Sequence, residues 1–167
     1  MKRIFGLAIL IVVVMSLIYN GDVGNSSIYV AAQAGHPKEI EQLFAAWNSH
    51  DPDKVAASFT DDAVYEDVAA GHISRGRTEV RKWAEGGFAV IENFKIELVS
   101  SSIHNKRGVA EWVWSGTDKG LFKTGMKFSV RGVSVFEVRR GKISHYKEFY
   151  DVATIMKQVG VLPAGKE

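Results

Sequence analysis

The segment VRGVSVFEVRRGKISHYKEFYD (130–151) alternates apolar and polar residues on both sides of the short polar run RRGK (139–142). Alternation with a period of two is typical of β-strands, and a short glycine-containing run between two such segments predicts a hairpin. We therefore expect antiparallel strands at 126–138 and 143–150, joined by a tight turn.

The second of these strands places a carboxylate between two aromatic residues. Because side chains two residues apart share one face of a strand, Tyr146, Glu148 and Tyr150 lie together. An acid at this position fits a solvent-facing edge, and it fits equally a pocket whose chemistry requires an acid.

Two more long strands are predicted before this hairpin, at 94–104 and 108–117, with the polar turn NKRG between them. The longer connection TDKGLFKTG (117–125) leads to the hairpin. A shorter strand at 61–68 precedes them, and the segment AAGHISRG (69–76) that follows it is expected to be a loop.

The beginning of the domain has helical periodicity instead. Ile40, Leu43, Phe44 and Trp47 form one apolar stripe, which predicts a helix at 37–49.

Three further helices follow from local signals. Asp51 is a favourable N-cap and Pro52 suits the first helical position, so a second helix begins there. A third helix runs from about Arg77 to Ala89, with Trp83 on its inner side. A terminal helix follows Asp151, which is a plausible N-cap.

Helices followed by long strands indicate an α+β fold. The long strands are apolar on both faces, since Val109 and Val113 lie opposite Trp112 and Trp114. A sheet with two apolar faces must have both covered. The N-terminal helices cover one face, and we expect a second subunit to cover the other, so the protein is predicted to be a homodimer.

The N-terminus has the features of a secretory signal. Lys2 and Arg3 precede an uncharged apolar run from Ile4 to Tyr19, which is shorter than the roughly 20 residues that span a bilayer. We expect a signal peptide at 1–34, cleaved after Ala34, and an exported, periplasmic or secreted domain at 35–167. An uncleaved anchor is the alternative. We expect no stable membrane association after cleavage.

Composition excludes some partners. The chain has 21 basic and 19 acidic residues, a balance that gives no reason to propose nucleic acid. It has no cysteine, so no disulfide supports the core. No His, Asp and Glu residues have the spacing of metal ligands, and no glycine-rich phosphate loop is present, so no metal and no cofactor are expected.

Three segments together resemble the SnoaL-like branch of the NTF2-like superfamily, and the resemblance covers nearly all of 36–162. They are FAAWNSHDPDKVAASFTDDAVYEDVAAG, GRTEVRKW and VRGVSVFEVRRGKISHYKEFYDVATIMKQVG. The resemblance implies a cone-shaped fold, in which N-terminal helices pack on a strongly curved mixed or antiparallel sheet and a short C-terminal helix follows. The superfamily includes polyketide cyclases, ketosteroid isomerases, limonene-type epoxide hydrolases and proteins that only bind ligands, so the fold alone does not define the activity.

The resemblance also implies which residues face the pocket. The expected catalytic residues are Asp67, Glu148, Tyr65 and Tyr146. The expected substrate-binding residues are Trp112, Trp114, Tyr150, Phe136, Trp83, Val130, Gly132 and Ser134.

The sequence departs from the residue patterns of two kinds of enzyme in this superfamily. The last strand resembles that of the epoxide hydrolases, but Trp112 and Trp114 occupy the places where those enzymes keep an arginine and an aspartate. The polyketide cyclases use a histidine near their acid, whereas His145 has the wrong strand parity and His104 lies near a strand end.

Burial of two neighbouring carboxyls raises their pKa, and mutual repulsion leaves one of them protonated. Asp67 and Glu148 then suit general acid–base catalysis, with Tyr65 or Tyr146 as a donor to developing negative charge. The chain is therefore predicted to be an isomerase, cyclase or lyase acting on a hydrophobic cyclic or carbonyl substrate. A protein that only binds a small hydrophobic ligand, and a module that uses its outer sheet face to bind a partner, are the alternatives.

Overall fold

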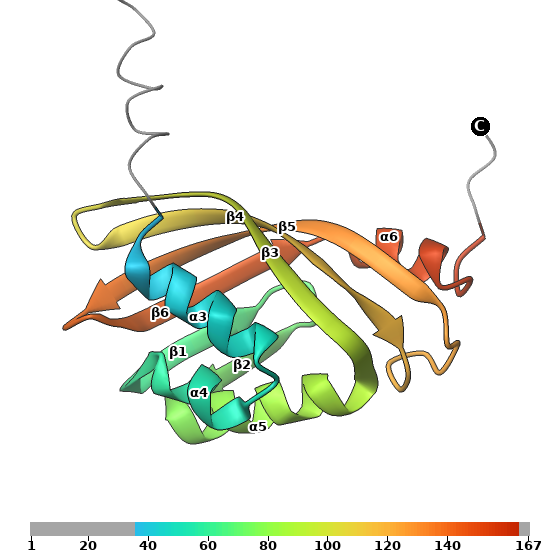
Figure 1. Ribbon diagram of the computed structural model, residues 1–167, viewed down its shortest axis with the longest axis horizontal. Coiled ribbons are helices and arrows are strands. Elements are labelled where there is room, and N and C mark those ends of the chain that lie inside the picture. Colours follow the sequence, from blue (N-terminus) through green and yellow to red (C-terminus); the bar gives the residue numbers. More distant parts are fainter. Residues whose placement is uncertain (1–35, 164–167) are drawn as a thin grey trace, which may run out of the picture. The chain divides into compact units, whose positions relative to one another are not determined.

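The computed structural model describes residues 36–163, and the signal peptide predicted at 1–34 lies outside this range. One six-stranded sheet runs through these residues in the order β2-β1-β6-β5-β4-β3 (Figure 1). Its strands are β1 (Phe59–Asp67), β2 (His72–Arg75), β3 (Ile91–His104), β4 (Arg107–Asp118), β5 (Lys127–Arg139) and β6 (Lys142–Tyr150). The α+β class is confirmed, and the sheet is mixed because β1 and β6 are parallel.

Within residues 36–163, four helices accompany the sheet: α3 (Lys38–Asn48), α4 (Pro52–Ala57), α5 (Gly76–Val90) and α6 (Val152–Gln158). The Asp51 side chain accepts hydrogen bonds from two backbone amides at the start of α4, and Asp151 accepts one at the start of α6. Both residues are therefore the N-caps that the sequence predicts. None of the described helices is long and apolar enough to cross a membrane.

The prediction that residues 69–76 form only a loop is wrong. Residues His72–Arg75 form the edge strand β2, which pairs antiparallel with β1. The chain reverses after β1 through a turn in which the Gly71 amide donates to the Val68 carbonyl. Gly71 has a φ of +67°, a conformation that glycine adopts without steric cost.

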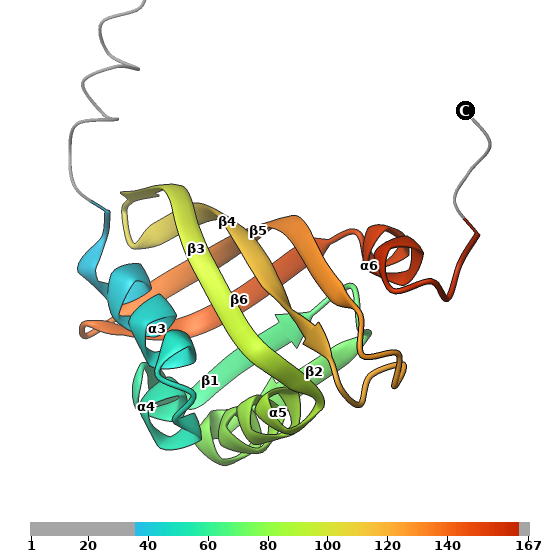
Figure 2. The same cartoon turned by 45° about the vertical axis from the view of Figure 1, so that its right-hand side comes forward.

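Helices α3, α4 and α5 lie on the concave side of the curved sheet, whereas α6 lies at the far end of the sheet from α3 (Figures 1 and 2). Along β5, the even-numbered residues from Phe128 to Phe136 are buried and the intervening residues are exposed. The alternation that predicts this strand therefore also separates the core face from the outer face.

The outer face of the sheet carries apolar residues that no described element covers. They are 42% to 45% exposed and comprise Val99, Val109, Val133, Val135 and Phe149. Several are direct neighbours across the strands, since Val109 pairs with Val135 and Val133 pairs with Phe149. They form one apolar patch, called here the outer patch.

Candidate active site

A cavity of about 280 Å³ lies on the concave side of the sheet. Its lining residues come from β1, β3, β4, β6, α3, α5 and two connections. They are Trp47, Tyr65, Asp67, Ala70, Trp83, Gly86, Gly87, Val90, Ile91, Phe94, Ile96, Trp112, Trp114, Leu121, Glu148 and Tyr150. The wall is mainly aromatic and aliphatic, and its acidic groups are Asp67 and Glu148. Such a mostly apolar hollow with a few convergent polar groups is typical of a small-molecule site.

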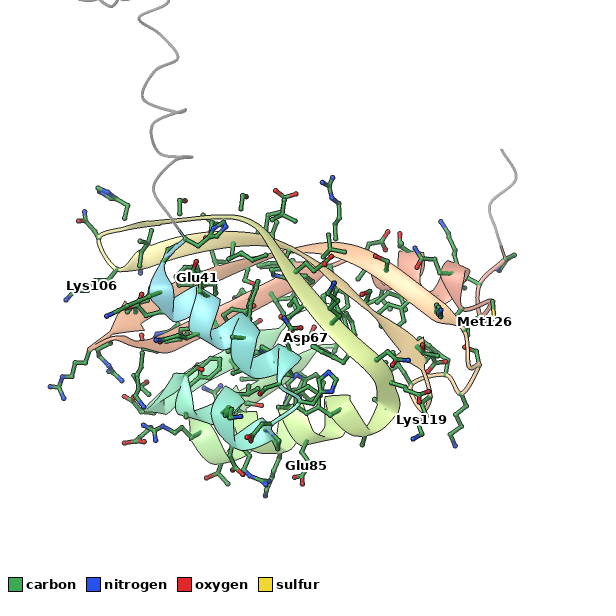
Figure 3. All side chains as sticks on the ribbon, viewed as in Figure 1. Glu41, Asp67, Glu85, Lys106, Lys119 and Met126 are labelled. Atoms are coloured by element: carbon green, nitrogen blue, oxygen red, sulfur yellow. The ribbon has the colours of Figure 1, made fainter. Side chains whose placement is uncertain are left out.

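The polar part of this cavity is built from the parallel strands β1 and β6. Their register sets Tyr65 beside Tyr146, and Asp67 beside Glu148. Because both strands have a period of two, all four side chains lie on the concave face. Figure 3 labels Asp67 among the side chains on this side of the sheet.

Each acid accepts a hydrogen bond from a tyrosine. The Tyr65 hydroxyl donates to Glu148 Oε1, and the Tyr150 hydroxyl donates to Asp67 Oδ2 at 2.9 Å. Asp67 Oδ1 also accepts from the Ala70 amide at 2.8 Å. Asp67 is only 3% exposed, so these bonds satisfy a carboxyl that water scarcely reaches.

The environment of Glu148 favours its neutral form. Burial raises the pKa of Glu148 to about 8, and the charge of Asp67 adds to the increase. Hydrogen bonds from Tyr65 and Tyr146 oppose it without cancelling it. Glu148 therefore carries a proton through most of the neutral range.

The tyrosines at the site also stay neutral. Burial raises the pKa of Tyr65 well above its ordinary value, and the nearby charge of Glu148 raises it further. Burial likewise raises the pKa of Tyr150, and the negative charge of Asp67 raises it further. Both phenols are therefore donors, not phenolates, at neutral pH.

A hydrogen-bonded chain supports the acids from behind the cavity wall. Trp112 Nε1 donates to Ser134 Oγ at 2.6 Å, and Ser134 Oγ donates to the Tyr146 hydroxyl at 2.6 Å. Tyr146 stacks on Tyr65, with ring centroids 5.3 Å apart. This chain fixes the orientation of the Trp112 indole and of both tyrosines.

Seven of the residues that the sequence predicts for the site line the cavity. They are Tyr65, Asp67, Trp83, Trp112, Trp114, Glu148 and Tyr150. These residues come together because β1, β4 and β6 share the concave face and α5 lies across it.

The other five predicted residues lie on the same sheet face but outside this cavity wall. They are Tyr146, Val130, Gly132, Ser134 and Phe136. The expectation that they contact the cavity directly is corrected by their packing. The hydroxyls of Tyr146 and Ser134 belong to the supporting chain. A Cβ on Gly132 would come within 2.1 Å of the Trp112 ring, so Gly132 makes room for that indole rather than for a ligand.

Several residues that line the cavity are not among those predicted from the sequence. Trp47 belongs to the apolar stripe of α3, where a cavity-facing residue has the same pattern as a core residue. Gly86 and Gly87 leave open space beside α5, because a Cβ on either would have no neighbour within 4 Å. In the sequence, the Gly86-Gly87 pair indicates only a weakened last turn of the helix.

The connection between β4 and β5 reaches the cavity through Leu121. The fully buried Asp118 holds it: its carboxylate accepts bonds from the Phe122 and Thr124 amides, each at 2.9 Å. The Thr124 hydroxyl adds a third bond at 2.8 Å. Figure 3 labels Lys119, which lies next to this anchor.

The histidines at 50 and 72 do not line the cavity. His50 Nε2 lies 2.7 Å from the Phe94 carbonyl oxygen. The His72 ring stacks on the cavity residue Trp83, with centroids 3.8 Å apart. Within residues 36–163, no three His, Asp or Glu side chains gather in a way that could hold a metal ion.

The model of the SnoaL-like domain family matches residues 40–146, and the chain belongs to this family. Its predicted likeness to the NTF2-like superfamily is thereby confirmed. Among curated proteins, none matches this sequence.

Solved structures share the fold. A Catenulispora acidiphila protein with a ketosteroid isomerase-like fold, in complex with trimethylamine, has 24% identity and a TM-score of 0.71, over 75% of this chain and 95% of its own. IdmH of Streptomyces antibioticus, a protein assigned to the polyketide cyclases, has 20% identity and a TM-score of 0.66, over 74% of this chain and 96% of its own. An LEH-like epoxide hydrolase of M. tuberculosis has 20% identity and a TM-score of 0.63, over 75% of this chain and 89% of its own. At these identities the likeness concerns the fold.

Proposed function

We propose that this protein is a cofactor-independent isomerase, cyclase or lyase that moves a proton on a small hydrophobic cyclic or carbonyl substrate. The observation that carries the proposal is the pairing of Glu148 with Asp67 in an apolar cavity, where the raised pKa of Glu148 keeps it protonated. One group then donates a proton while its neighbour accepts one, as general acid–base catalysis requires.

The hydrogen bonds suggest which acid has which role. Asp67 uses both oxygens as acceptors, for Tyr150 and Ala70, so it is the base that removes a proton from carbon next to a carbonyl. Glu148 donates its proton to the carbonyl oxygen as negative charge develops there. Tyr65 then stabilises the Glu148 carboxylate that is left, through the hydrogen bond it already donates.

The size of the cavity limits the substrate. A volume of about 280 Å³ lies at the small end of the roughly 300–1,000 Å³ of typical ligand sites. A one-ring or two-ring ketone fits this space better than a four-ring steroid does. The small ligand of the Catenulispora relative, trimethylamine, agrees with a site of modest size.

Deuterium exchange tests proton transfer without knowledge of the natural substrate. The protein is incubated in water with 2-decalone deuterated next to its carbonyl, and the loss of deuterium is followed by mass spectrometry. We expect faster loss than in buffer, and loss at the buffer rate with Asp67→Asn. Glu148→Gln is expected to slow exchange strongly, whereas Glu92→Gln, on the exposed surface, matches the wild type. Unchanged exchange in the Asp67 and Glu148 variants would refute the assignment.

A non-catalytic binding protein is the second candidate. The observation that favours it is that both carboxyls already have hydrogen-bond partners inside the protein, which is also how buried acids are satisfied when they have no catalytic role. In this case 2-decalone binds, as followed by tryptophan fluorescence, and no exchange above the buffer rate accompanies binding.

We further propose that the protein is exported after cleavage behind Ala34 and that the outer patch joins two copies in a homodimer. The apolar start of the chain supports the first proposal, and the uncovered valines and Phe149 support the second. The intact mass of the protein recovered outside the cytoplasm tests cleavage. A mass that includes residues 1–34 would contradict it.

A further inference from the structure

The cavity wall combines aromatic rings with acids. Seven of its residues are aromatic, and they include all four tryptophans of the chain. Two more are the carboxyl residues Asp67 and Glu148. Among the described residues that line it, none is Lys, Arg or His. The cavity therefore offers negative charge and the faces of aromatic rings, and no positive counter-charge.

The aromatic wall is continuous with the acids. The Tyr150 ring lies 5.5 Å from the Trp114 ring and 6.1 Å from the Trp112 ring, measured between centroids. The hydroxyl of the same tyrosine donates to Asp67. The indoles and both carboxyls line the same cavity. A ligand that contacts these indoles therefore lies beside the carboxyl pair.

This combination favours one charge type. The face of an aromatic ring carries negative partial charge, and tryptophan attracts cations more strongly than the other aromatic residues do. His72, which pairs with Asp67 across β1 and β2, lies outside the cavity wall. A carboxylate in a wall without basic residues repels anions and attracts cations, and it does so more strongly where water is scarce. An ammonium group with alkyl substituents suits both the aromatic wall and the carboxylate, because its outer surface is apolar and its charge is positive.

We propose that this cavity binds a small tertiary or quaternary ammonium compound, with its nitrogen among the indole rings and beside Asp67. The inference goes beyond proton transfer, since a cation can bind here whether or not the protein catalyses a reaction. It also predicts that the site rejects carboxylate-bearing compounds of the same size.

A matched pair of probes tests the charge preference. Choline and 3,3-dimethyl-1-butanol have nearly the same shape, but only choline carries a positive charge. Their Kd values are measured by isothermal titration calorimetry on the purified full chain. We expect choline to bind at least about tenfold more tightly, which corresponds to the range of a desolvated cation–π contact. Equal Kd values would overturn the inference.

A variant distinguishes the contribution of the Asp67 charge to choline binding from the contribution of the aromatic rings. Asp67→Asn is expected to weaken choline binding about tenfold or more and to leave 3,3-dimethyl-1-butanol unchanged, because only the cation interacts with the charge. Glu92→Gln serves as the control for loss of an acid elsewhere. Circular dichroism verifies that each variant is folded. Choline binding that Asp67→Asn leaves unchanged would overturn the role of Asp67. Neither probe undergoes the proton transfer proposed above, so these results do not depend on it.

Discussion

Asp67 and Glu148 are partners across the parallel pairing of β1 with β6, and each accepts a hydrogen bond from a tyrosine on the other strand. Tyr65 of β1 donates to Glu148, whereas Tyr150 of β6 donates to Asp67. The arrangement is therefore reciprocal. It ties the two strands together through side chains, and it keeps two carboxyls close within a cavity that is otherwise apolar.

The first prediction concerns stability and pH. Because the folded-state pKa of Glu148 is raised from 4.5 to about 8, the folded protein binds more protons than the unfolded chain between these values. Its free energy of unfolding is then highest below the unfolded pKa and falls as the pH rises through the folded one. We expect a loss on the order of 4 kcal/mol between about pH 5 and pH 9.

Urea unfolding at several pH values measures this loss. Glu148→Gln removes the titrating group, so its free energy of unfolding should vary much less over the same range. Glu92→Gln, on the exposed surface, should keep the slope of the wild type. An equally steep slope in Glu148→Gln would show that another group causes it.

The second prediction concerns Tyr65. Its hydrogen bond lowers the pKa of Glu148, so Tyr65→Phe should raise that pKa further. If Glu148 acts as an acid, the alkaline limit of the deuterium exchange described above moves to higher pH. Tyr150→Phe is the matched control, because Tyr150 donates to Asp67 instead. A limit that moves to lower pH in Tyr65→Phe would contradict the assignment of Glu148 as the acid.

The third prediction concerns the anchor of the β4–β5 connection. Asn at position 118 retains one acceptor oxygen, so Asp118→Asn loses part of the set of bonds from Phe122 and Thr124. We expect a loss of about 1–3 kcal/mol in the free energy of unfolding, together with weaker binding of cavity ligands, because Leu121 is then held less firmly.

Chemical denaturation and calorimetric titration measure these two effects. Asp61→Asn is the control, since Asp61 forms an exposed ion pair with Arg77, and such pairs contribute roughly 0–1 kcal/mol. Ligand binding that stays unchanged in Asp118→Asn would mean that the position of Leu121 does not influence the cavity.

The fourth prediction tests the homodimer. Val133→Glu places a charge in the middle of the outer patch, where burial against a second copy would be costly. Light scattering after size-exclusion chromatography should give the mass of a dimer for the wild type and of a monomer for this variant. Val161→Glu changes an equally exposed valine outside the patch and should remain dimeric. A monomeric wild type would refute the proposal.

The long strands could be predicted because their patterns are local. Each has alternating residues and a turn signal at its end, and the bounds in the structure differ from the predicted ones by at most three residues. The edge strand β2 has four residues, and only its pairing with β1 makes it a strand. Such a segment has too few alternating positions to stand out from a loop in sequence alone.

The site was predicted in part, for a related reason. Strand parity puts Glu148 and Tyr150 on one face, and the family resemblance implies that this face and Asp67 line the pocket. The structure has all three residues in one cavity wall. Parity does not tell which residues of that face reach the cavity and which lie beneath other rings. Gly132 illustrates the limit: its small size indicates space for a ligand, yet the Trp112 indole fills that space.

The parallel joining of β1 to β6 also determines when the site can form. Tyr65 and its partner Glu148 are 83 positions apart in the chain, and β6 is the last strand to leave the ribosome. Until it emerges, the strand pair β1–β2 is not joined to β3, β4 and β5, and the nascent chain has only one of the two acids. A product that stops short of this final strand thus lacks the acid pair altogether, however well its earlier hairpins have formed.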